Sequence, residues 1–142
     1  EFYEEGIKAS MADAGISGET VGKYMQSTMP NAYGTTVPFD HEGASHDSRL
    51  EKIITQKWIA CYPEGCEAWA EQRRTGYPRL FPVLVNKSNG KIDTRTMIRR
   101  LNFPVSIISG NPAQYSALCE YLGGPDTGGT RLWWDTGVNF RD

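Results

Sequence analysis

Long apolar runs are absent from this 142-residue sequence, and no stretch approaches the roughly 18 residues that a bilayer-spanning helix needs. Concentrated positive charge is also absent. The 15 Lys and Arg residues are scattered among 17 Asp and Glu residues, and the net charge is −2. Because nucleic-acid-binding proteins need a clustered basic face, the composition argues against that class.

Motifs for covalent or phosphate chemistry are missing as well. The G-x-S-x-G motif that carries a serine nucleophile is not present in the sequence. Gly123-Gly124 is followed by proline, not by the Lys-Ser/Thr of a phosphate-binding loop. Glu64, Glu67 and Glu71 are carboxylates of the kind that glycosidases use, but their i, i+3, i+7 spacing with arginines nearby is typical of an exposed, charge-paired helix face. We predict no catalytic residue.

Metal and redox sites are weakly supported. Both histidines lie in the segment 40–47, DHEGASHD, whose spacing matches neither H-E-x-x-H nor an EF-hand, so a solvated loop is favoured over a metal site. The cysteines are Cys61, Cys66 and Cys119, an odd number without zinc-ligand spacing. Cys61 and Cys66 fall at core-facing helical positions, which favours small apolar core residues. A disulfide stays open if the protein is exported. We predict no metal and no cofactor.

The first third of the chain is patterned for helices. Tyr3, Ile7 and Met11 recur at helical spacing, and this helix ends at Gly15. Ser17 is the expected cap of a second helix, which ends before Pro30. Residues 30–47 are rich in turn-forming residues and predict a loop.

Two further helices are expected to meet at a proline. The capping box Ser48-Arg49-Leu50-Glu51 predicts the start of the third helix, which ends near Tyr62. Pro63 is expected at the first position of the fourth helix. There Arg73 lies four residues after Trp69 and can cover its indole.

The pattern changes beyond Gly76-Tyr77-Pro78, which should stop the fourth helix. Leu80, Val83 and Val85 indicate short extended structure, and Asn89-Gly90 suits a tight turn, so a small β-hairpin is one interpretation. Asn111-Pro112 predicts the start of a last helix that ends at Gly123-Gly124. The fold class is therefore mostly α, with long loops.

The aromatic tail holds the candidate ligand-binding residues Trp133, Trp134, Asp135 and Asn139. Indole faces stack on the apolar faces of sugars, while carboxylates and amides bind hydroxyl groups. The alternative is that at least one of the tryptophans anchors the tail to the core, because large aromatic side chains mostly pack where they can.

The sequences of four segments resemble the C-terminal region of SusD/RagB-like proteins, especially the SusD-like branch. The segments are FYEEGIKASMADAGIS, KWIACYPEGCEAWAEQRRTGYPRLFP, IRRLNFPVSIISGNPAQYSAL and LGGPDTGGTRLWWDTG. Together they span nearly the whole chain. Residues 1–142 are therefore expected to form a single C-terminal SusD-like region of a longer protein.

The resemblance implies a fold and a role. SusD-like proteins are mostly helical, with a tetratricopeptide-related scaffold, and are surface-exposed lipoproteins of the outer membrane. They bind oligosaccharides or other nutrients, without cleaving them, for a SusC-like TonB-dependent transporter. The resemblance implies no nucleic-acid partner, and membrane contact only through a lipid anchor upstream of this sequence. Two rivals remain: a helical-repeat protein-interaction scaffold without a small-molecule ligand, and a glycan-cleaving enzyme.

Overall fold

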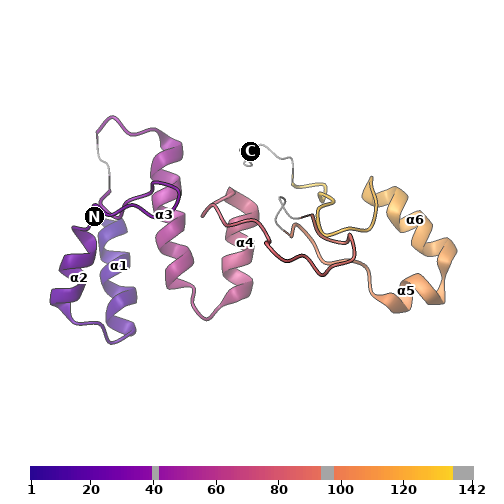
Figure 1. The fold of residues 1–142 in the computed structure, drawn as a ribbon, viewed down its shortest axis with the longest axis horizontal. Coiled ribbons are helices and arrows are strands. Elements are labelled where there is room, and N and C mark those ends of the chain that lie inside the picture. The colour runs from indigo at the N-terminus through magenta and orange to yellow at the C-terminus, as the bar shows by residue number, and fades with distance from the viewer. Residues whose placement is uncertain (40–41, 94–97, 136–142) are drawn as a thin grey trace. The chain divides into compact units, whose positions relative to one another are not determined.

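The computed structural model describes residues 1–39, 42–93 and 98–135, and it is helical (Figure 1). Over these ranges there are six helices and no β-strand, which confirms the predicted mostly α fold. Their bounds are α1 Phe2–Asp13, α2 Gly18–Met25, α3 His46–Ala60, α4 Gly65–Thr75, α5 Val105–Gly110 and α6 Pro112–Leu122.

The chain divides into two compact units, Glu1–Arg79 and Leu80–Asp142. In the first unit α1 packs against α2 and α3, and α3 packs against α4 (Figure 1). Its apolar core is small and consists of Ile7, Val21, Ile54, Ala68 and Tyr77. That residues 1–142 form one region of a longer protein stays a prediction.

Several helix ends of the first unit lie where local rules place them. The side chain of Ser17 accepts a hydrogen bond from the Thr20 amide, as expected of an N-cap. Gly15 and Gly76 follow α1 and α4 with φ values of 73° and 79°. Because an L side chain is strained in this left-handed region, glycine suits both helix ends.

The predicted start of α3 at Ser48 was wrong. Ser45 is the N-cap, and its hydroxyl accepts from the Ser48 amide, so the helix begins at His46. The proposed capping box also needed Glu51 to reach back toward Ser48. Instead the Glu51 carboxylate accepts hydrogen bonds from Arg79 and Thr35.

Pro63 was also misplaced by the prediction. The chain makes a turn after α3 in which the Glu64 amide donates to the Cys61 carbonyl, and α4 begins at Gly65 with Glu64 as N-cap. Cys66, expected in the core, is exposed, because α4 buries its Ala68, Gln72 and Thr75 face instead. All three cysteines are free thiols.

In the second unit α5 packs against α6. Asn111 caps α6 by accepting from the Gln114 amide, and Gly123 ends that helix with φ 76°, as predicted. The six-residue α5 was not predicted, because it is too short to show a helical repeat. Among the described residues of this unit, the buried side chains are all charged: Arg99, Arg100, Asp126 and Asp135.

The small hairpin is not formed among the described residues of this unit. The expected tight turn exists: Asn89 and Gly90 have φ values of 53° and 81°, and the Lys91 amide donates to the Ser88 carbonyl. However, the backbone of Ile92 is bound by side chains. Its amide donates to the Ser88 hydroxyl, and its carbonyl accepts from Asn86 and Ser88. These hydrogen bonds occupy the backbone groups of Ile92 that would otherwise pair with a neighbouring β-strand.

Candidate functional site

Trp133 and Trp134 are the two central residues of a tight turn. The Asp135 amide donates to the Leu132 carbonyl at 2.8 Å, which closes a four-residue turn around the two tryptophans. Trp133 is 92% exposed and Trp134 is 39% exposed. Of the two predicted stacking residues, Trp133 therefore offers nearly its whole indole to solvent.

Asp135, the last residue of this turn, is buried. Its Oδ2 accepts from Nε of Arg99 at 2.6 Å, and the terminal nitrogen of Arg99 lies 2.6 Å from the same oxygen. Both side chains are only 3% exposed. A carboxylate engaged in this way is a structural anchor more than an acceptor for ligand hydroxyl groups. Asn139, the fourth predicted residue, lies outside the described residues.

A second buried ion pair supports the same unit. Arg100 donates to Asp126 at 2.6 Å, and its guanidinium carbon lies 4.6 Å from the ring centroid of Phe103. Both Asp126 carboxylate oxygens also accept from the Phe103 amide, at 3.0 and 3.2 Å. Burial raises the pKa of Asp126, but the hydrogen bonds from Arg100 and Phe103 outweigh it and hold the pKa below its ordinary value of 3.8.

The arginines of the two ion pairs also share a backbone hydrogen-bond acceptor. The amides of Arg99 and Arg100 both donate to the Gly128 carbonyl, at 2.7 and 3.3 Å. A Cβ on Gly128 would lie 3.3 Å from the Ile92 side chain and 3.4 Å from the Lys91 carbonyl, so a larger residue there would require the Ile92 side chain to shift by a few tenths of an ångström. The segment leading to the tryptophan turn is thus tied to residues 99 and 100.

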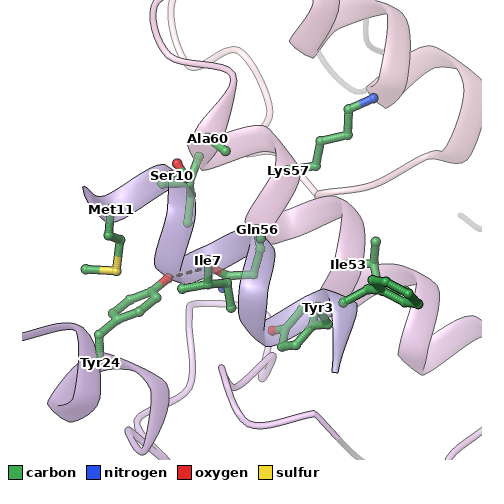
Figure 2. A pocket seen from close by; sticks show the side chains of 12 residues that line it. Tyr3, Ile7, Ser10, Met11, Tyr24, Ile53, Gln56, Lys57 and Ala60 are labelled. Atoms are coloured by element: carbon green, nitrogen blue, oxygen red, sulfur yellow. Dashed lines mark hydrogen bonds between the residues drawn. The ribbon is translucent and has the colours of Figure 1, made fainter. Parts of the chain in front are cut away.

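The first unit carries an apolar groove of about 450 Å³ among α1, α2 and α3. Figure 2 shows Tyr3, Ile7 and Met11 of α1 among the residues that line it, together with Ile53 and Gln56 of α3. The Tyr24 hydroxyl of α2 donates to Gln56 at 2.9 Å. The groove offers apolar contact and few polar groups that could orient a sugar.

A polar pocket of about 220 Å³ in the same unit was not predicted. Arg79 binds Glu51 through two hydrogen bonds of 2.9 Å, and its guanidinium lies 5.7 Å from the ring centroid of Tyr33. Buried Lys52 donates to Thr36 and to the Pro38 carbonyl. These bonds hold the segment between α2 and α3 against α3. Because the residues that pair here are far apart in the sequence, no local sequence pattern predicts this pocket.

Of the three glutamates that the sequence placed on a charge-paired helix face, Glu67 and Glu71 lie on α4 and form ion pairs, whereas Glu64 is the N-cap that precedes the helix. Lys57 binds Glu67 at 2.9 Å and Glu71 at 3.0 Å, and Arg74 also pairs with Glu71. The hydrogen bond from Arg74 lowers the pKa of Glu71, burial raises it, and Lys57 lowers it further; the net shift is downward. A carboxylate held ionised in this way is poorly suited to act as a general acid.

The described part of the chain has neither a cluster of metal-ligand residues nor a membrane-spanning helix. No three His, Cys, Asp or Glu residues there gather closely enough to hold a metal ion; Asp40 and His41 lie outside it. None of the helices over the same ranges has the length and apolar character needed to cross a bilayer.

Comparison with known proteins identifies the family. The model of the SusD-like family, described as SusD and RagB outer-membrane lipoproteins, matches residues 1–135. The chain belongs to the SusD-like family. No protein with a curated description matches it.

Solved SusD homologues share its fold. A SusD homologue from Bacteroides vulgatus is 48% identical, with a TM-score of 0.78, over 98% of this chain and 30% of that one. A chitin-binding SusD homologue from Flavobacterium johnsoniae is 44% identical, with a TM-score of 0.75, over 97% and 32%. One from Bacteroides thetaiotaomicron is 37% identical, with a TM-score of 0.78, over 94% and 32%. The chain therefore spans about a third of the length of these relatives.

Proposed function

We propose that this chain is the glycan-binding part of a nutrient-uptake lipoprotein and that Trp133 is a stacking residue of its site. The observation that carries this proposal is the nearly complete exposure of the Trp133 indole on a turn that a buried ion pair holds in place. Family membership supports it, as does the similarity to a chitin-binding relative. An exposed, well-positioned aromatic is what a sugar-binding surface needs.

Binding would proceed without bond chemistry. The indole of Trp133 stacks on the apolar face of a pyranose ring, and neighbouring polar groups bind its hydroxyls. Trp134, which is more buried, contributes the edge of this surface. Asp135 takes part indirectly, by holding the turn through Arg99. Membership of the SusD-like family supports binding without cleavage, and we propose that the protein is not an enzyme.

The family description supports a cellular role at the outer membrane. We place the complete protein at the outer membrane, exposed at the cell surface and held by a lipid anchor upstream of residue 1. There it would capture oligosaccharides and pass them to a SusC-like TonB-dependent transporter. Recovery of such a transporter with the full-length lipoprotein from detergent-solubilised outer membranes would support this partnership. Recovery of the lipoprotein alone would argue against it.

Calorimetric titration with defined oligosaccharides tests the binding function. Chitohexaose is the first probe, because a relative that is 44% identical is described as chitin-binding, and maltohexaose is the comparison. We expect a saturable heat with at least one of the two. The same incubation, assayed for new reducing ends, should show none. New reducing ends would favour the glycan-cleaving enzyme.

The second candidate function is a protein-interaction scaffold, which the apolar groove of the first unit favours. The two functions predict different sensitive residues. Glycan binding depends on Trp133, whereas a protein contact in the groove depends on Ile53 and Ile59, which line it and are exposed. If neither oligosaccharide binds, the scaffold function becomes the better account.

A further inference from the structure

We propose that Arg99 is a positioning residue for the tryptophan turn and that it sets the affinity of the site without touching the ligand. The effect on affinity rests on the proposed glycan binding, whereas the ordering of the turn rests only on the contacts that Arg99 makes. Arg99 contacts the segment 128–135 at both ends. Its amide donates to the Gly128 carbonyl at 2.7 Å, and its side chain binds Asp135 at 2.6 Å.

Pinning both ends of a segment restricts the conformations between them. A flexible loop gains entropy when its ends are released, and a ligand that binds it must then supply the free energy of ordering. Trp133 and Trp134 lie inside the pinned segment, next to its anchored end. Arg99 therefore orders the indoles before the ligand arrives.

The anchor depends on arginine rather than on positive charge alone. Two nitrogens of Arg99, Nε and a terminal nitrogen, approach the same carboxylate oxygen of Asp135. A lysine keeps the charge but has a single nitrogen on a flexible stem, so it cannot reproduce this contact. Arg99→Lys therefore loosens the anchor while avoiding a buried carboxylate without any cation, which would be far more damaging.

The neighbouring ion pair is the matched control. Arg100 and Asp126 are as deeply buried as Arg99 and Asp135 and belong to the same unit. Asp126 binds the Phe103 amide and Arg100, and it lies two residues before the segment 128–135 rather than beside the tryptophans. Arg100→Lys should thus lower the melting temperature to a similar degree and leave the turn ordered.

The test combines backbone relaxation with binding. Amide ¹⁵N order parameters are measured for Trp133 and Trp134 in the wild-type chain and in Arg99→Lys, Asp135→Asn and Arg100→Lys. We expect values near 0.85 in the wild type and in Arg100→Lys, falling below about 0.6 in the two Arg99–Asp135 variants, while α6 is unchanged. Chitohexaose affinity should fall about tenfold in those two variants and stay within about twofold in Arg100→Lys.

The outcomes separate this inference from the proposed function. Unchanged order at Trp133 and Trp134 in both Arg99→Lys and Asp135→Asn would overturn the positioning role, and so would an equal loss of order in Arg100→Lys. These readouts need no ligand. If the wild-type chain binds neither chitohexaose nor maltohexaose, the proposed function fails instead. If order falls but affinity does not, Arg99 holds the turn without serving the site, and the inference is wrong.

Discussion

The guanidinium of Arg73 lies over the indole of Trp69, with Cζ 3.9 Å from the ring centroid. The residues are one helical turn apart on α4, so the helix itself brings them together. Both Trp69 and Arg73 are half-buried. This segment of the sequence is thus built for packing, and the candidate binding surface lies in the other unit.

Arg73→Ala should lower the free energy of unfolding by about 0.5–2 kcal/mol, because both the cation–π contact and the cover over the indole are lost. Urea denaturation of the chain measures this change. Arg74→Ala is the control, since Arg74 is the next residue and its side chain is 60% exposed where it pairs with Glu71. It should cost at most about 0.5 kcal/mol. Equal effects of the two variants would contradict the stacking.

Glu51→Gln should destabilise the first unit by about 2 kcal/mol, because two charge-assisted hydrogen bonds from Arg79 lose their ionised acceptor. Glu67→Gln serves as the comparison, since Glu67 pairs with Lys57 at 2.9 Å on an exposed helix face. That change should cost less than about 1 kcal/mol. Thermal and urea unfolding of both variants would show the difference, and a smaller effect at Glu51 than at Glu67 would count against the buried network.

Acid should weaken the second unit through Asp126. Its pKa in the folded chain lies below the ordinary value of 3.8 that it takes when unfolded. The unfolded chain therefore binds the proton at higher pH, so this contribution to stability is complete above the unfolded pKa. It is lost as the pH falls through the folded pKa. Asp126→Asn should remove this contribution to the pH dependence. Unfolding free energies measured between pH 7 and pH 2 test it, and a variant with the wild-type slope below pH 4 would refute it.

The sequence predicted helix ends correctly where the interactions that determine them involve residues close together in the chain. Ser17 and Asn111 cap α2 and α6 because each side chain reaches an amide three residues ahead. Gly76 and Gly123 end helices because both adopt a left-handed backbone. The contact between Arg73 and Trp69 was predictable for the same reason, since helical spacing determines it.

Errors arose where a distant partner decided the outcome. The expected cap at Ser48 failed partly in this way: Ser45 caps the helix instead, and Glu51, which the capping box needed, binds Arg79, 28 residues away. Over the described residues the Asn89–Gly90 turn is not flanked by strands, and side chains bind the backbone groups of Ile92 that a hairpin would use. Asp135 looked like a ligand-binding acid beside two tryptophans, and its burial by Arg99, 36 residues away, could not be read from spacing.

The account depends most directly on Trp133, and its removal is the decisive measurement. Chitohexaose titrations would compare the wild-type chain with Trp133→Ala and with Tyr121→Ala, whose side chain on α6 is equally exposed at 93%. We predict that Trp133→Ala weakens binding about tenfold or more, as loss of a central aromatic contact does, and that Tyr121→Ala binds as the wild type does. Wild-type affinity in Trp133→Ala would contradict the account.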